Sequence, residues 1–289
     1  MTTTQSLATA VSYNDTKSPD CFSPSLLVGP LLWGVFSVPC ACVGVPAGVW
    51  LLCVLVQRQR SGLANDVYTL HVTVMDVIFN STVLPGTLIY FLCGNSTLLP
   101  FTVFFYSLNL CGRPLVMVCI CVDCYLAVLH PITYMKTRQH RYKQVLCAAI
   151  WVLTICFGVL SVHKIGLIVR MLYLIPNTLV AVVTVFCDLA ILRALRKPDP
   201  SGRGSIHPQK QRAVLAVTNS FVVTVLFYLP LLVVEGLAPL MPLSQLEVQC
   251  LVHVPASIGP LLGSAIMPLL HLVHLKSWCT LCGHGGGQC

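Results

Sequence analysis

Charge is scarce in this 289-residue sequence: Asp, Glu, Lys and Arg together make up 9% of it, against about 25% in an average soluble domain. Hydrophobic residues make up 56%. The polar residues are too few to cover a folded body in water, so a separate soluble domain is excluded. The composition indicates an integral membrane protein.

Acidic residues are especially few, and none are arranged for catalysis. Asp76 and Asp123 lie in different predicted helices at different depths, so they form no catalytic carboxylate pair. The glycines of 283–287 belong to a tail and not to a phosphate-binding loop. One Cys-x-x-Cys without a second spaced pair does not indicate zinc. We therefore expect no enzymatic activity, no cofactor and no metal.

Long apolar runs are abundant by contrast. Seven of them reach or approach the roughly 20 residues that cross a hydrocarbon core about 30 Å thick. They cover residues 26–56, 67–93, 99–129, 145–162, 168–195, 213–240 and 246–275. The predicted fold is all-α, a seven-transmembrane helix bundle.

Basic residues are distributed unevenly between the two sides of the membrane. One side carries Arg58, Arg60, Lys276 and the basic residues of 136–143 and 193–212, whereas the other carries Lys17, Lys164 and Arg170. The positive-inside rule makes the first side cytoplasmic. These flanking segments account for the net charge of +8, so nucleic-acid binding is not indicated.

This orientation predicts three regions: an extracellular N-terminal segment (1–25), a transmembrane domain (26–275) and a short cytoplasmic tail (276–289). Residues 1–25 lack the pattern of a cleavable signal peptide, so we expect the first span to insert as its own anchor. The sequons at Asn14 and Asn95 fall on the outer side, where N-glycosylation takes place.

Landmark residues recur at matching places in the predicted helices. Residues 44–48 read Gly-Val-Pro-Ala-Gly, and residues 119–131 read Cys-Ile-Cys-Val-Asp-Cys-Tyr-Leu-Ala-Val-Leu-His-Pro. The other landmarks are Asp76, Trp151, Pro176, Pro230 and Pro268. Over nearly the whole chain this set resembles the rhodopsin-like (class A) G-protein-coupled receptors, closest to their nucleotide- and lipid-receptor branch.

The activation motifs of that family are degenerate here. Its Asp-Arg-Tyr reads Asp123-Cys124-Tyr125, and its Asn-Pro-x-x-Tyr reads Met267-Pro268-Leu269-Leu270-His271. Tyr228 replaces the sixth-helix Trp, two residues before Pro230. Because Cys124 replaces the arginine, we expect Asp123 to lose its neighbouring cation.

Asp76 and Arg113 are predicted to lie at the same depth. At about 1.5 Å per residue, both are roughly 21–24 Å below the outer surface. A charge at the bilayer centre costs at least about 2.5–3.5 kcal/mol, so each should face the bundle interior and find a partner. The resemblance places Asp76, Asn109 and Arg113 in the family's sodium pocket. Our hypothesis is that the guanidinium fills the sodium position and pairs with Asp76.

The alternative is that Arg113 contacts backbone carbonyls or waters while Asp76 is protonated. The residue after Arg113 is Pro114, which should kink or locally open the third helix, because an interior proline removes a hydrogen bond and clashes with the preceding turn.

The outer third of the bundle contains the ligand candidates. Two helices take up nearly all of residues 151–176, so the second extracellular loop should be a short turn near 163–166 and the cavity open. The candidates are Tyr90, Tyr106, Arg170, Tyr173, Glu235 and His253. As the resemblance implies, Arg170 and His253 would suit an anionic ligand such as a nucleotide or lipid acid. The alternative for Arg170 is a position at the membrane interface.

Most of the 16 cysteines lie in the spans and should be buried free thiols. The resemblance implies a Cys21–Cys250 disulfide, although Cys93 makes other pairings available. Cys279 and Cys282 lie next to the membrane, where S-palmitoylation occurs.

The resemblance implies a multi-pass plasma-membrane receptor that transduces an extracellular ligand to a heterotrimeric G-protein, with coupling weakened by Cys124. Membrane lipid is a further expected partner. The alternative is a non-signalling membrane protein on the receptor fold, acting as partner or decoy of another receptor in a heteromer; Pro114, Met267 and His271 favour it.

Overall fold

The described part of the chain is helical throughout its regular elements. The computed structural model describes residues 26–61, 66–93, 99–137, 139–163, 166–196, 221–222 and 224–283. Its elements are α1 (Val28–Arg60), α2 (Val67–Cys93), α3 (Leu99–Ser107), η2 (Leu108–Gly112), α4 (Arg113–Leu129), α5 (Pro131–Thr137), α6 (His140–Val162), α7 (Gly166–Arg196), η3 (Thr224–Tyr228), α9 (Leu229–Leu237), η4 (Ala238–Leu240), α10 (Gln245–Glu247), η5 (Val248–His253), α11 (Val254–Ala256) and α12 (Ile258–Gly283). The predicted all-α class is confirmed.

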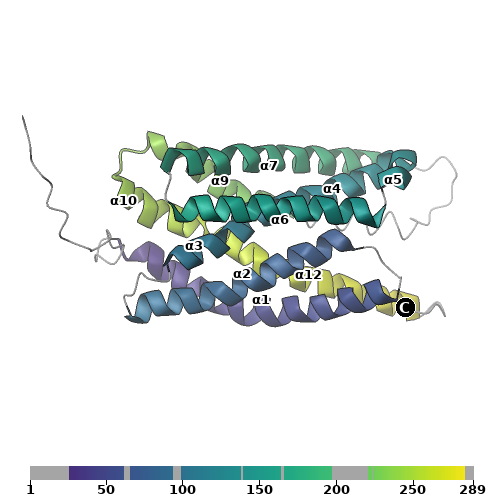
Figure 1. The fold of residues 1–289 in the computed structure, drawn as a ribbon, viewed down its shortest axis with the longest axis horizontal. Helices are drawn as coiled ribbons and strands as arrows, with labels where there is room; N and C mark the ends of the chain where they lie inside the picture. Colours follow the sequence, from purple (N-terminus) through teal and green to yellow (C-terminus); the bar gives the residue numbers. More distant parts are fainter. Residues whose placement is uncertain are drawn as a thin grey trace, which may run out of the picture.

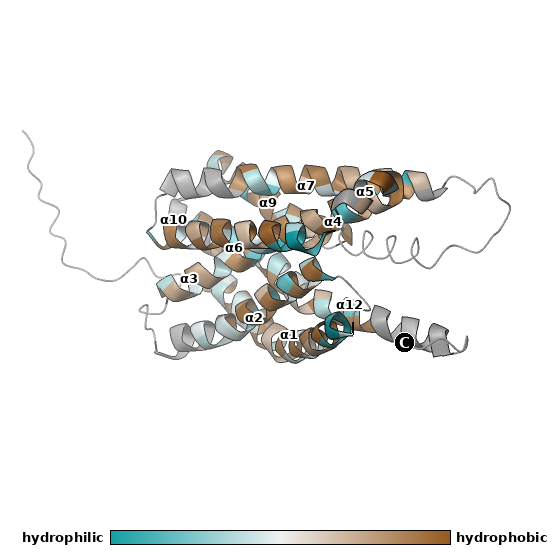
Figure 2. Cartoon of the chain, turned by 45° about the vertical axis from the view of Figure 1, so that its right-hand side comes forward, coloured by the Kyte–Doolittle hydropathy of each residue, from teal (hydrophilic) through white to brown (hydrophobic). Residues whose placement is uncertain are grey.

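The membrane-spanning segments agree closely with the apolar runs. Five helices are long and apolar enough to cross a bilayer: Val28–Arg60, Pro100–Leu129, His140–Val162, Leu174–Ala194 and Cys250–Val273, while Thr224–Leu240 is shorter. Helix α2 has the bounds predicted for the second span. Hydrophobic colouring extends along α1, α6 and α7 (Figure 2). Large apolar side chains such as Trp50, Val152 and Phe186 are exposed on these helices, as expected where lipid replaces water.

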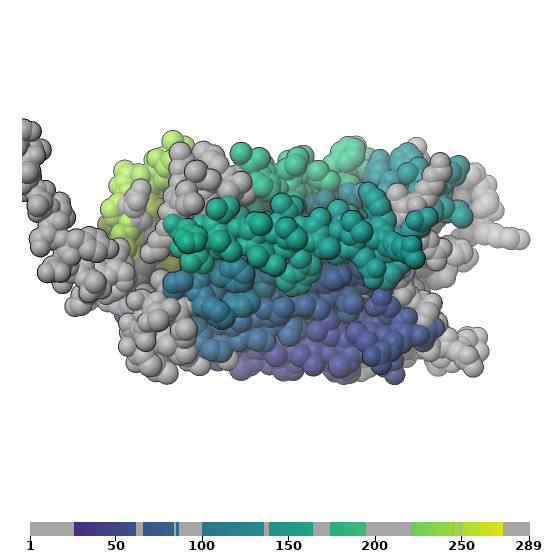
Figure 3. Space-filling view, in the orientation of Figure 1, coloured from purple at the N-terminus to yellow at the C-terminus, as the bar shows by residue number. Residues whose placement is uncertain are grey.

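The helices pack side by side along one long axis (Figure 1). Helix α1 packs against α2 and α12, α3 against α6, and α4 against α7. In the space-filling view α6 lies in front and α1 forms the lower edge (Figure 3). The short elements α10 and α5 lie at opposite ends of the bundle (Figure 1). Side chains of α2, α4 and α6, including Met75, Val116 and Ile150, form a buried core.

Small residues on α1 permit this close packing. A Cβ atom at Gly44 would lie 3.1 Å from the side chain of Asn80 and 3.2 Å from the Cα of Ala265. Helices in lipid associate through such small residues because their backbones can approach closely. Gly44 therefore brings α1, α2 and α12 together next to the polar centre of the bundle.

Three π-helical segments occur in the described residues, and each ends two residues before a proline. Segments η2, η3 and η5 precede Pro114, Pro230 and Pro255 respectively. A proline lacks the N–H for the preceding turn and clashes with the carbonyl four residues earlier, and wider π bonding relieves both. The opening predicted at Pro114 thus takes the form of a π turn. Pro176 and Pro268 lie inside continuous α-helix, so proline permits this turn without requiring it.

The predicted absence of a long second extracellular loop is confirmed, because α6 ends at Val162 and α7 begins at Gly166. Two features were not predicted. The short helix α5 follows α4 directly, starting at Pro131, a residue suited to the first helical position. Helix α12 continues to Gly283, past the end of the predicted seventh span at 275. No glycine or proline interrupts residues 269–282, which explains the extension.

The segment leading into the seventh span begins with a capping box. The backbone N–H and hydroxyl of Ser244 each donate to Glu247 Oε2 at 2.8 Å, and the Glu247 N–H donates to Ser244 Oγ at 3.3 Å. This reciprocal pattern satisfies N–H groups that a helix start leaves without partners. The same hydrogen bonds from Ser244 lower the pKa of the Glu247 carboxyl.

Candidate functional site

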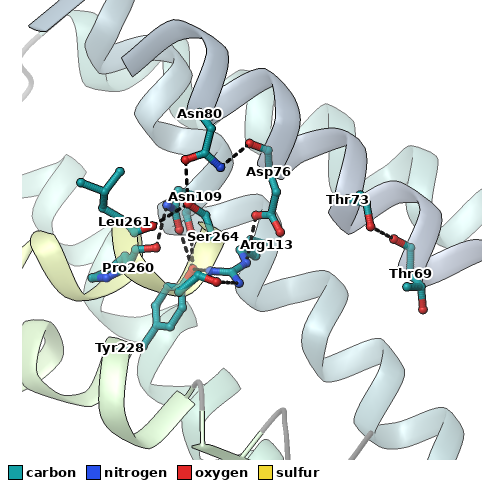
Figure 4. Close-up of polar contacts among 11 residues, drawn as sticks. Thr69, Thr73, Asp76, Asn80, Asn109, Arg113, Tyr228, Pro260, Leu261 and Ser264 are labelled. Atoms are coloured by element: carbon teal, nitrogen blue, oxygen red, sulfur yellow. Dashed lines mark hydrogen bonds and ion pairs between the residues drawn. The ribbon is translucent and has the colours of Figure 1, made fainter. Parts of the chain in front are cut away.

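Arg113 is the centre of a polar network in the middle of the bundle. It is the first residue after the π turn η2, and its side chain is fully buried. Its three nitrogen groups face three different spans (Figure 4). Nε lies 3.1 Å from Asp76 Oδ1 on α2, Nη1 donates to Tyr228 Oη at 3.1 Å, and Nη2 donates to the Gly263 carbonyl on α12 at 2.7 Å. One side chain thus connects the third span to the second, sixth and seventh.

Tyr228 and Asn109 extend the network. The Tyr228 hydroxyl accepts from Arg113 and donates to Asn109 Oδ1 at 2.6 Å. The Asn109 amide in turn donates to the Pro260 carbonyl at 3.1 Å. The Arg113 guanidinium carbon also lies 5.8 Å from the centre of the Tyr228 ring, within cation–π range. The sequence indicated Tyr228 as a replaced motif residue and as a ligand-facing candidate, but not its contact with Arg113.

The polar network continues on the side of Asp76. Asn80 Nδ2 donates to the Asp76 carbonyl at 2.8 Å, and Ser264 Oγ lies 3.3 Å from Asn80 Oδ1. These side chains are buried. A Cβ atom at Gly263 would lie 3.0 Å from Arg113 Nη1, so a glycine there leaves room for the guanidinium. Gly263 and Ser264 were not among the predicted site residues.

The structure brings together the predicted set of Asp76, Arg113 and Asn109. The contact between Asp76 and Arg113 Nε is an ion pair that is not aligned as a hydrogen bond. The guanidinium uses its two terminal nitrogens for hydrogen bonds instead. Charge balance comes from Asp76, while orientation comes from Tyr228 and Gly263. Backbone carbonyl contact, offered as an alternative partner for Arg113, therefore accompanies the ion pair.

Asp123 does not lose its cation, which corrects one expectation. Lys143 Nζ on α6 lies 2.6 Å from Asp123 Oδ2. Lys143 had been counted as a residue of the second cytoplasmic segment, but α6 begins at His140, earlier than the predicted 145. The lysine therefore lies inside the bundle, with its side chain 4% exposed. The missing arginine at position 124 is replaced by a cation from another helix.

The neighbours of Cys124 are charged. Asp123, Asp188 and the Lys143 ammonium all lie within electrostatic range of its thiol. Asp188 is fully buried on α7, next to Cys121. The Cys121 thiol is the side-chain group against the Asp188 carboxyl. Tyr125, the third residue of the motif, packs at 5.7 Å from the ring of His130.

The remaining motif positions lie in the sixth and seventh spans. Met267 is buried in the core shared with Tyr228, whereas His271 is half-buried. Pro268 lies inside α12, and Pro230 lies in the first turn of α9. Met267 and His271 present no matching pair of polar groups in place of the family's asparagine and tyrosine.

Two of the described ligand candidates, His253 and Glu235, contact each other, whereas Tyr106 contacts other residues of the bundle. His253 Nδ1 lies 2.7 Å from Glu235 Oε1, with both side chains less than one-fifth exposed. The Tyr106 hydroxyl donates to the Ser257 carbonyl at 3.4 Å, and its ring packs on Trp33 and Phe79. Glu235 therefore occupies Nδ1 of His253, which weakens His253 as a group for an anionic ligand.

Several predicted residues lie outside the described part of the chain. These are Cys21, Asn14 and Asn95, together with the side chains of Tyr90, Arg170, Tyr173, Cys279 and Cys282. Cys250 is buried and disulfide-bonded. Its pairing with Cys21 stays a prediction.

Comparison with known proteins agrees with this architecture. The model of the 7 transmembrane receptor (rhodopsin family) matches residues 48–167. The uracil nucleotide/cysteinyl leukotriene receptor of Rattus norvegicus is 30% identical over 196 residues, which cover 65% of this chain and 50% of that receptor. Proteinase-activated receptor 3 of Homo sapiens is 35% identical over 115 residues, covering 38% and 30%. G-protein coupled receptor 183 of Rattus norvegicus is 25% identical over 116 residues, covering 38% and 32%.

The chain spans half or less of the length of these curated relatives. The matched stretch includes the Asp76 and Arg113 positions and the Asp123-Cys124-Tyr125 motif, on a bundle of membrane-length helices. These matches and the helical bundle support a resemblance to the rhodopsin-like (class A) G-protein-coupled receptors over that stretch.

Proposed function

We propose that the chain transduces an extracellular, anionic ligand across the plasma membrane to a heterotrimeric G-protein, with weak coupling. An anionic ligand is suggested by one relative, whose name describes a receptor for a uracil nucleotide and a cysteinyl leukotriene. The orientation with the N-terminal segment outside rests on the basic residues of the opposite side. Membrane lipid surrounds the apolar faces of α1, α6 and α7.

The observation that carries weak coupling is the environment of Cys124. In place of an arginine, a thiol lies beside Asp123, and that carboxylate is already paired with Lys143. Asp188, buried on α7 beside Cys121, adds a second acidic group near Cys124. An arginine at this position would have two carboxylates within reach, whereas cysteine offers neither a charge nor a strong donor.

The test compares the wild type with Cys124→Arg and Cys124→Met in a G-protein and arrestin recruitment screen. We expect low recruitment by the wild type and higher recruitment by Cys124→Arg. Cys124→Met adds length without charge and serves as the matched control. Equal recruitment by all three, at a level typical of a coupled receptor, would contradict weak coupling through position 124.

No recruitment by any variant would favour the second candidate, a non-signalling partner or decoy in a receptor heteromer. Met267 and His271 motivate that candidate, because methionine removes the amide of the seventh-helix motif and histidine replaces its tyrosine. Co-purification with a second receptor would then be the next measurement. Antibody access to N-terminal and C-terminal tags on intact cells tests the orientation separately, since only the N-terminal tag should be stained.

A further inference from the structure

Lys143 lies in an unfavourable place for a cation. It is in the first turn of α6, where the helix dipole is positive, and its side chain is 4% exposed. Taking an ammonium group out of water is costly unless it is paired and hydrogen-bonded. A lysine retained here needs strong compensation from its surroundings.

Three side chains from three other elements supply that compensation. Asp123 on α4 accepts a hydrogen bond from Nζ at 2.6 Å. The ring centres of Tyr68 on α2 and Tyr134 on α5 lie 5.2 Å and 5.8 Å from Nζ, within cation–π range. The ammonium group therefore touches α2, α4 and α5 from its own position on α6.

Helix α5 depends on contacts of this kind. It has 7 residues, too few for a stable helix on its own. Its outward side chains are highly exposed, at 79% for Ile132 and 75% for Met135, so they contribute little packing on the bundle. Tyr134 lies on the half-buried side and faces the lysine.

We propose that Lys143 is a positioning residue that fixes the orientation of α5. It is the counter-ion of Asp123 and contacts the ring of Tyr134. The position of its ammonium group therefore fixes the direction in which α5 turns Ile132 and Met135. Asp123, Tyr68, Tyr134 and Lys143 lie on α4, α2, α5 and α6, so within the described residues these contacts include none from the sixth span. The inference rests on the proposed function only in taking α5 to be cytoplasmic.

Hydrogen–deuterium exchange on the full-length protein in nanodiscs tests this inference without any signalling readout. In Lys143→Met, which keeps length and removes charge, the amides of 131–137 should exchange about tenfold faster than in the wild type. Lys143→Arg keeps the charge and the cation–π contacts, so it should restore protection. Gln144→Met changes the adjacent, exposed residue of α6 and should leave α5 unchanged.

Tyr134→Leu removes the ring and its hydroxyl but leaves the Lys143–Asp123 pair in place, and it provides a second test if Lys143→Met does not fold. It should also accelerate exchange in α5, and the double variant should be no faster than Lys143→Met, because both changes remove one contact. Unchanged exchange of α5 in Tyr134→Leu or in a folded Lys143→Met would overturn the proposal. Equally faster amide exchange in α1, α7 and α12 would overturn the proposal as well, since Lys143 would then stabilise the whole fold and not α5 in particular.

Discussion

Removing the Arg113 guanidinium should destabilise the bundle strongly. Arg113→Met would leave the Asp76 carboxyl, 3% exposed, without a cation, and would leave Tyr228 Oη and the Gly263 carbonyl without their donor. Breaking a buried ion pair from one side costs about 3–5 kcal/mol. At roughly 2–4 °C per kcal/mol for a chain of this size class, the expected loss in melting temperature is about 6–20 °C.

The double variant separates charge pairing from packing. Asp76→Asn combined with Arg113→Met removes both charges, so the melting temperature of this double variant should fall less than that of Arg113→Met alone. Arg113→Lys keeps a charge but cannot donate to three spans from one rigid group. Its melting temperature should therefore lie between those of the wild type and Arg113→Met. A thiol-reactive dye on detergent-purified protein reports melting, because Cys121 and Cys147 are buried until unfolding.

The reasoning fails if the double variant loses as much stability as the two single variants together. That result would mean that Asp76 and Arg113 contribute independently, despite the 3.1 Å between Nε and Oδ1. A melting temperature of Arg113→Met close to that of the wild type would also refute the pairing, because the buried Asp76 carboxyl would then be stable without the guanidinium.

Three further predictions follow from the described contacts. If Arg113 fills the sodium position, the melting temperature of the wild type should be the same in sodium chloride and choline chloride at equal ionic strength, and a sodium-dependent rise should appear only in Arg113→Met. Tyr228→Phe leaves Asn109 Oδ1 without its donor and should lower the free energy of unfolding by about 1–3 kcal/mol, measured as a lower melting temperature. In a coupled receptor it should also raise basal G-protein activation. Unchanged values of both would contradict the role of the hydroxyl. Ser244→Ala removes the hydroxyl contacts of the capping box and keeps the backbone N–H bond to Glu247 Oε2, so it raises the pKa of Glu247 part of the way towards its ordinary value; amide exchange at 245–249 should accelerate with little change in melting temperature.

Depth in the membrane could be predicted from the sequence, but the direction in which each side chain points could not. Asp76 and Arg113 fall at one depth by residue count, and lipid forces both inward, so their proximity was predictable. Tyr228 also falls within a predicted span, but whether its hydroxyl meets Arg113 depends on the rotation of the helix. That rotation is set by the π turns η2 and η3, whose extra residue shifts every side chain that follows.

Lys143 shows the second limit. Charged residues at 141 and 143 placed the start of the fourth span at 145, because isolated charges normally mark a membrane boundary. The helix begins at His140 instead, and the lysine is tolerated because Asp123 and two aromatic rings surround it. A partner from another helix is not visible in a linear sequence, so both the early start and the retained counter-ion of Asp123 were missed.

The two buried cations connect different sets of helices. Lys143 joins α4 to α2, α5 and α6, whereas Arg113 joins the third span to the second, the sixth and the seventh. Among the described residues, only the second set includes the sixth span, through the hydroxyl and the ring of Tyr228. Movement of the sixth span away from the third would therefore break hydrogen bonds at Tyr228 while leaving the Asp123–Lys143 pair intact. A ligand that drives such movement must offset the cost of those hydrogen bonds, so Tyr228→Phe should respond to lower ligand concentrations than the wild type, while Lys143→Arg should not.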